Sequence, residues 1–140
     1  MAALTFDDSK KAEFVAAIAG ILRVQRAAAG GRCIEDERGN INRRALGYIY
    51  GFIDAALRPL GQDMADISIG VPIACNVLEQ LFPEPGKAKR SITFLIDHLG
   101  RDAMVNQGVM KGGQQWLDFN KPGTKGAPMG FARYLIQGDE

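Results

Sequence analysis

The chain carries a single histidine, His98, within the run Phe94-Leu95-Ile96-Asp97-His98. Histidine is the side chain best suited to acid–base chemistry near neutral pH. Successive residues of a helix point about 100° apart, so Asp97 and His98 diverge although they are adjacent in the sequence. Their adjacency therefore does not predict a catalytic Asp–His pair.

The segment around His98 has an outer face that is explained first as an exposed helix surface and second as a contact surface. On a helix, Phe94 and its charged neighbours lie opposite the apolar stripe that includes Leu95. A large aromatic side chain among charged residues indicates a surface that another protein covers. An exposed face with one Asp97–Arg101 ion pair is favoured over this contact surface, and a catalytic surface ranks third. The interface candidates are Phe94, Asp97, His98, Arg101 and Val105.

A second group of residues is a candidate ligand pocket. Asp54 precedes Arg58 by four residues, the favourable order for an ion pair along one helix. Gly47 and Gly51 share that helix, where close approach of a second helix is favoured over contact with a ligand. The sole tryptophan, Trp116, is interpreted as a packing anchor, with stacking on a ligand as the alternative. The pocket candidates are Asp54, Arg58, Gly47, Gly51, Lys111 and Trp116.

The sequence predicts no metal and no cofactor. A closed zinc site takes about four nitrogen or sulfur ligands, and the chain has two cysteines and one histidine. The glycine-rich run at 108–113 lacks the spacing of phosphate-binding loops. Cys33 and Cys75 form no CxxC pair, so we expect free thiols in a reducing compartment rather than a disulfide.

Composition excludes several classes of protein. The 46% hydrophobic and 24% charged residues are typical of globular domains. Seventeen basic and sixteen acidic side chains give a net charge of +1, which disfavours nucleic acid as a partner. No apolar stretch has the length of a membrane span, and the first residues do not form a secretory signal. We therefore expect a cytoplasmic protein with no membrane partner.

Hydrophobic periodicity predicts an all-α fold, a single compact bundle of four to five helices in one domain over residues 1–140. A Gly/Lys-rich loop over 106–127 precedes a short C-terminal helix. Residues 63–71 fit a short strand, a loop or the start of a kinked helix, and Pro72 suits the first turn of the third helix. The predicted helices span 6–29, 42–60, 72–82, 86–105 and 128–137.

These features favour a non-enzymatic helical module that acts by self-association or by binding a protein partner. The alternative is a small helical enzyme or ligand-binding protein with a pocket around Asp54, Arg58 and His98. In that case residues 106–130 would close the pocket as a lid. Nucleic-acid binding ranks third.

Overall fold

The computed structural model describes residues 7–62, 67–123 and 128–137. Across these residues the fold is all-α, as the sequence predicts, with no β-strand and with six α-helices rather than the four to five expected. A 3-10 turn, η1 (Arg58–Leu60), continues the second helix. The helices in chain order are α1 (Asp8–Ala28), α2 (Arg43–Leu57), α3 (Ile67–Leu81), α4 (Lys87–His98), α5 (Ala103–Phe119) and α6 (Gly130–Gln137).

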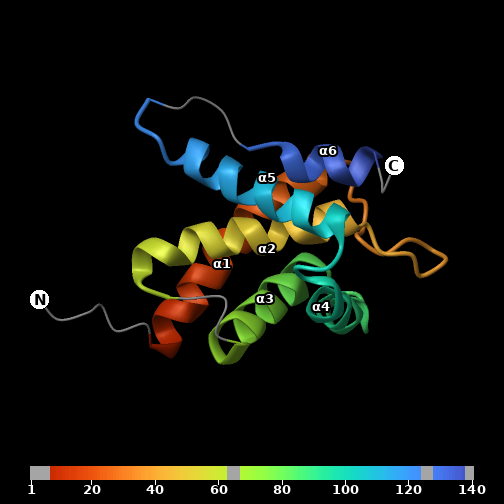
Figure 1. The fold of residues 1–140 in the computed structure, drawn as a ribbon, viewed down its shortest axis with the longest axis horizontal. Helices are drawn as coiled ribbons and strands as arrows, with labels where there is room; N and C mark the ends of the chain where they lie inside the picture. Colours follow the sequence, from red (N-terminus) through yellow and green to blue (C-terminus); the bar gives the residue numbers. More distant parts are fainter. Residues whose placement is uncertain (1–6, 63–66, 124–127, 138–140) are drawn as a thin grey trace, which may run out of the picture.

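The helix α2 lies at the centre of the molecule. In Figure 1, α5 and α6 pack on one side of α2, and α3 and α4 lie on the other. The helix α1 contacts both α3 and α6. Tyr48, Phe52 and Leu57 of α2 are fully buried, so most faces of this helix are covered by its neighbours. Burial of these apolar side chains is the main stabilising contribution to the fold.

The predicted helix over 86–105 is wrong beyond His98, where α4 ends. Gly100 takes a left-handed conformation with φ of +79°, which glycine adopts without strain. Asp102 then caps α5, since its Oδ1 accepts hydrogen bonds from the backbone nitrogens of Met104 at 2.8 Å and Val105 at 3.1 Å. Residues 103–105 therefore begin a new helix that runs in another direction.

The predicted glycine-rich loop over 106–127 is also wrong for residues 106–119, which are helical in α5. Glycine lowers intrinsic helix propensity by about 1 kcal/mol per residue, so the sequence pattern favours a loop. Tertiary contact outweighs that preference here, because the glycines of α5 lie against α2. Residues 124–127 of the predicted loop lie outside the described residues.

The other helices match their predicted ranges to within a few residues, except the third. The helix α3 begins at Ile67, so Pro72 lies inside the helix and not in its first turn. Residues 67–71 are helical, neither strand nor loop. Residue 6 and residues 63–66 lie outside the part of the chain that the structure describes.

Candidate functional site

Four glycines bring α2 and α5 into backbone contact. Gly47 and Gly51 face α5 at the backbone of Val105 and Val109, and a Cβ on Gly51 would lie 2.8 Å from the Cα of Val109. From the other side, a Cβ on Gly112 would lie 2.9 Å from the backbone nitrogen of Phe52. Gly108 meets the backbone of α2 one turn earlier. Gly47 and Gly51 therefore serve helix packing, and the α5 backbone occupies the space a ligand would need.

The remaining side chains of α5 have an unusual distribution. Its buried residues are small, namely Val105, Gly108 and Gly112. Two of its large aliphatic side chains are outside, with Met110 75% exposed and Leu117 55% exposed, while Met104 is half-buried. An ordinary surface helix buries its large apolar residues against the core. The helix α5 departs from that arrangement at Met110 and Leu117, although Val109 and Trp116 do pack against the core.

Trp116 is held by aromatic neighbours, while Lys111 is exposed on the surface. The Trp116 ring meets Phe52 of α2 edge to face, with centroids 5.2 Å apart, and lies 6.4 Å from the Phe119 ring. Such edge-to-face pairs stabilise packing beyond the area they bury. Trp116 thus anchors the C-terminal half of α5 to α2.

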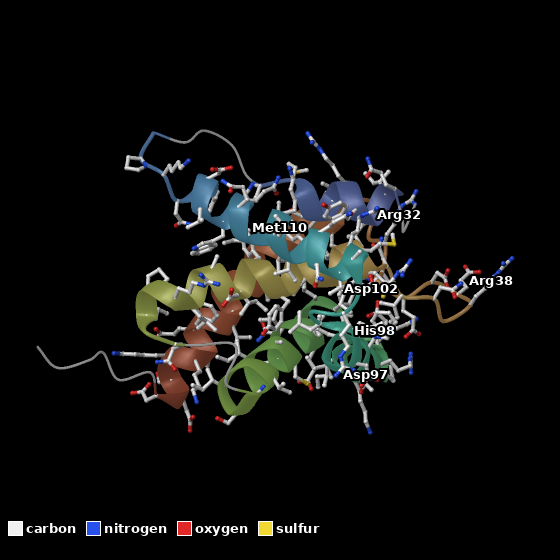
Figure 2. All side chains as sticks on the ribbon, viewed as in Figure 1. Arg32, Arg38, Asp97, His98, Asp102 and Met110 are labelled. Atoms are coloured by element: carbon white, nitrogen blue, oxygen red, sulfur yellow. The ribbon has the colours of Figure 1, made fainter. Side chains whose placement is uncertain are left out.

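Two of the interface residues predicted on α4, Phe94 and His98, pack against each other. The rings of Phe94 and His98 stack at 3.8 Å with an interplanar angle of 8°, and both side chains are half-buried. Nδ1 of His98 lies 2.8 Å from the carbonyl oxygen of Phe94, so this nitrogen donates. Asp97 and Arg101 are exposed, and Figure 2 labels Asp97 and His98 at the end of α4. His98 therefore covers part of the aromatic face that would anchor a partner.

Val105 does not belong to the α4 surface. The helix break at Gly100 places Val105 on α5, where its side chain is fully buried. The predicted five-residue interface assumed one continuous helix, and the break removes its last member.

Asp54 and Arg58 form an ion pair, with Oδ2 and Nη2 2.8 Å apart. The Arg58 side chain is 75% exposed and the Asp54 side chain 20% exposed. The pair lies near the C-terminal end of α2, which Figure 1 places on the opposite side of the view from α4, the helix that ends at His98. The predicted pocket of Asp54, Arg58 and His98 is therefore not assembled.

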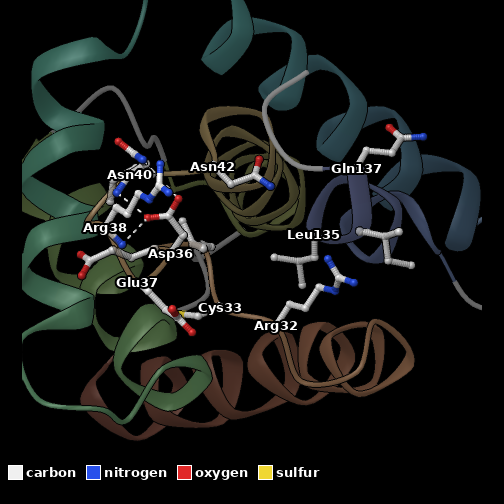
Figure 3. Close-up of a pocket in the computed structure, with 13 residues that line it drawn as sticks. Arg32, Cys33, Asp36, Glu37, Arg38, Asn40, Asn42, Leu135 and Gln137 are labelled. Carbon is white, nitrogen blue, oxygen red and sulfur yellow. Dashed lines mark hydrogen bonds between the residues drawn. The ribbon is translucent and has the colours of Figure 1, made fainter.

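A groove of about 770 Å³ lies elsewhere, between residues 32–42 and residues 135–137. Figure 3 shows Arg32 beside Leu135 on one side of this groove and Asp36 with Arg38 on the other. Asp36 accepts hydrogen bonds from the backbone nitrogens of Arg38 and Asn40, each at 2.9 Å. None of the pocket candidates predicted from the sequence lines the groove.

Glu35 is the most buried charged residue beside the groove, with 7% of its surface exposed. Arg90 holds its carboxylate with two hydrogen bonds of 2.7 and 2.9 Å, and Lys87 approaches to 3.1 Å. The hydrogen bond from Arg90, with help from Lys87, keeps the pKa of Glu35 below its ordinary value against the effect of burial. The groove's buried charge is thus neutralised by the protein's own side chains, and its polar groups serve the fold.

Two glutamines and a tyrosine hold the start of α6. Tyr48 donates to Oε1 of Gln115 at 2.6 Å, and that oxygen also accepts from the backbone nitrogen of Gly130 at 2.8 Å. Oε1 of the fully buried Gln25 accepts from the backbone nitrogen of Phe131 at 2.9 Å. Burial raises the pKa of Tyr48 to about 12. Gln25 and Gln115 thus take the place of an N-terminal cap. Sequence reasoning missed them, and Gln25 in an apolar stripe was the available signal.

In the described part of the chain, no group of three or more His, Cys, Asp or Glu residues is placed to hold a metal ion. Cys33 and Cys75 are free thiols. Among the same residues, no helix has the length and apolarity to cross a lipid bilayer. Comparison of the chain with protein-family models, with curated proteins and with solved structures gives no match.

Proposed function

We propose that the protein is a non-enzymatic helical interaction module that contacts itself or another protein through the outer face of α5. We define this face as Ala103, Met110, Gln114 and Leu117. The observation that supports it is the exposure of Met110, at 75%, and of Leu117, at 55%, on a helix whose fully buried residues are Val105, Gly108 and Gly112. The contact surface proposed here thus lies on α5 and not on α4, where the sequence places it.

Helical geometry gathers these residues on one stripe. Residues seven apart lie almost directly above one another on a helix, which aligns Ala103, Met110 and Leu117. Gln114 lies between Met110 and Leu117, four residues from one and three from the other. Two large apolar side chains therefore project side by side from one exposed face. Figure 2 labels Met110 on α5.

The chemistry of the face also fits a contact surface. Methionine is flexible and polarizable, and it is frequent at protein-binding surfaces that adapt to a partner. The α4 surface offers less, because Phe94 is half-buried under His98. The exposed Val24 on α1, at 61%, has only alanine, glycine and half-buried Ile21 as helical neighbours. Val24 is therefore a matched control, similar in exposure but without a second large exposed apolar residue on its face.

The test places a photoreactive benzophenone amino acid at Met110 of the full chain and, separately, at Val24. Illumination in cells and of the purified protein is expected to give covalent adducts from position 110 and none from position 24. The adduct should disappear when Leu117→Glu is added, since a specific contact needs both apolar residues. Absence of an adduct at 110, or an adduct that Leu117→Glu leaves unchanged, would overturn the proposed function.

A further inference from the structure

We infer that the occupant of the outer face of α5 is a second copy of the same chain, with the two α5 helices antiparallel. This inference rests on the proposed function and adds the identity and orientation of the partner. It is carried by the order of apolar and charged residues along α5, which is complementary to its own reverse.

An antiparallel pair with its two-fold axis between Gly113 and Gln114 places Met110 opposite the partner's Leu117. The dimer then contains two identical contacts between a methionine and a leucine, because an isologous interface repeats every contact. Gly113 adds no side chain near the axis, so the partner helix has room to approach. A parallel pair would instead place Met110 against the partner's Met110. It would also put each residue beside the apolar stripe on the flank opposite to its counterpart in the partner.

Charge favours the same orientation. Lys111 and Asp118 lie seven residues apart and so share one flank of the outer face. A two-fold axis perpendicular to antiparallel helices keeps that flank on the same side of both copies. Lys111 is then level with the partner's residue 116, and its long side chain reaches diagonally to the partner's Asp118, two residues further along. The Asp118 side chain is 50% exposed, and its Oδ1 lies 3.2 Å from Nζ of Lys121 and accepts a hydrogen bond from Gln114 at 3.0 Å. The partner's Lys111 would join this cluster from its exposed side. Two intermolecular ion pairs would thus flank the apolar contact.

The size of the outer face of α5 sets the affinity that we expect for the dimer. A helix of 17 residues is about 25 Å long, and one face of it makes an interface at the small end of the range for specific complexes. We therefore expect a reversible dimer with Kd on the order of micromolar, not an obligate one.

The first test is sedimentation of the purified full chain up to about 0.2 mM, a concentration at which a micromolar dimer is saturated. The wild type should be dimeric, while Lys111→Glu alone and Asp118→Lys alone should each raise Kd by about tenfold, because each puts like charges opposite one another. An equimolar mixture of the two variants should restore the wild-type Kd, since both ion pairs re-form in the heterodimer. Lys89→Glu on α4 is the charge-matched control and should leave Kd unchanged.

A second test reads the orientation directly. In a Cys33→Ser, Cys75→Ser background, Gln114→Cys lies at the two-fold axis and should oxidise to a covalent dimer. Ala103→Cys lies far from its own copy in an antiparallel pair and should not. Circular dichroism of each variant checks that the helices are intact.

The outcomes separate the inference from the proposed function beneath it. A monomeric wild type whose position 110 still cross-links to a different protein overturns the second copy and leaves the interaction module standing. A dimer that cross-links through Ala103→Cys, or one whose variants fail to complement on mixing, overturns the antiparallel arrangement. A monomer with no adduct at position 110 overturns both.

Discussion

Gly112 of α5 lies directly against Tyr48 of α2, where a Cβ added to the glycine would collide with the tyrosine's backbone carbonyl oxygen. The same relationship recurs one turn away, between Gly108 and Arg44. Two glycine pairs with four-residue spacing, one on each helix, thus interlock at the centre of the fold. Backbone at the contact cannot move aside as a flexible side chain can, so this packing depends on the missing Cβ atoms.

Gly112→Ala should therefore lower the free energy of unfolding by about 3 kcal/mol or more, as overpacking against a rigid backbone does. Gly113→Ala is the matched control on the next residue, because its Cβ would lie 3.6 Å from the nearest atom, the carbonyl oxygen of Gly51. That variant should be neutral or gain up to about 1 kcal/mol from helix propensity. Urea unfolding measures both, and equal effects would contradict the account of the α2–α5 contact.

The sequence predicts those parts of the fold in which large apolar residues recur with helical spacing. α1 and α2 follow that pattern, and their ranges agree with the structure. α5 does not, since its contact surface is made of glycines, which by local propensity mark a loop. The signal present in the sequence was the shared four-residue spacing of Gly47–Gly51 and Gly108–Gly112, which becomes informative only when two helices are considered together.

The site residues were harder to predict for a related reason. The Asp54–Arg58 pair is local in sequence and forms as its spacing indicates. Glu35 and Arg90, by contrast, are 55 residues apart, and no local pattern links a loop carboxylate to the first turn of α4. The break at Gly100 also redirects the chain. Residues that would share a face of one continuous helix over 86–105 therefore lie on two different helices.

Asp54→Asn should change the free energy of unfolding by only about 0.5 kcal/mol, because its partner Arg58 is 75% exposed and such pairs are screened by water. Thermal unfolding at low and high salt checks the size of the effect, and added salt should reduce it further. A loss well above 1 kcal/mol would show that Asp54 has a structural role beyond this pair.

Glu35→Gln should cost about 2 kcal/mol near neutral pH, since a buried carboxylate held by Arg90 and Lys87 loses its charge. Glu37→Gln, an exposed change in the same loop, is the control and should have little effect. Urea unfolding of the three proteins at neutral pH gives the comparison. An equal loss in both variants would mean that Glu35 has no special role.

The pH dependence of the Glu35 contribution has a defined sign. Its pKa in the folded protein is below the ordinary value of 4.5, so the unfolded chain binds more protons between the two values. The wild type therefore keeps this stability above pH 4.5 and loses it as the pH falls through the folded pKa. The gap between wild type and Glu35→Gln should narrow over that interval in an acid titration of urea unfolding, and a constant gap would contradict the assignment.

Tyr48→Phe should lower the free energy of unfolding by about 1–2 kcal/mol, because it removes the hydroxyl between Gln25 and Gln115 while keeping the ring. Burial raises the pKa of Tyr48 from 10 to about 12, so the folded protein holds the phenolic proton more tightly than the unfolded chain. This contribution is complete below pH 10 and is lost as the pH rises towards 12. The difference in the free energy of unfolding between wild type and variant should therefore shrink in alkaline urea unfolding.

Hydrogen exchange at the backbone nitrogens of Gly130 and Phe131 should also become faster in Tyr48→Phe, since the two glutamines that bind these nitrogens lose their shared partner. Unchanged exchange there would show that α6 is held without the tyrosine.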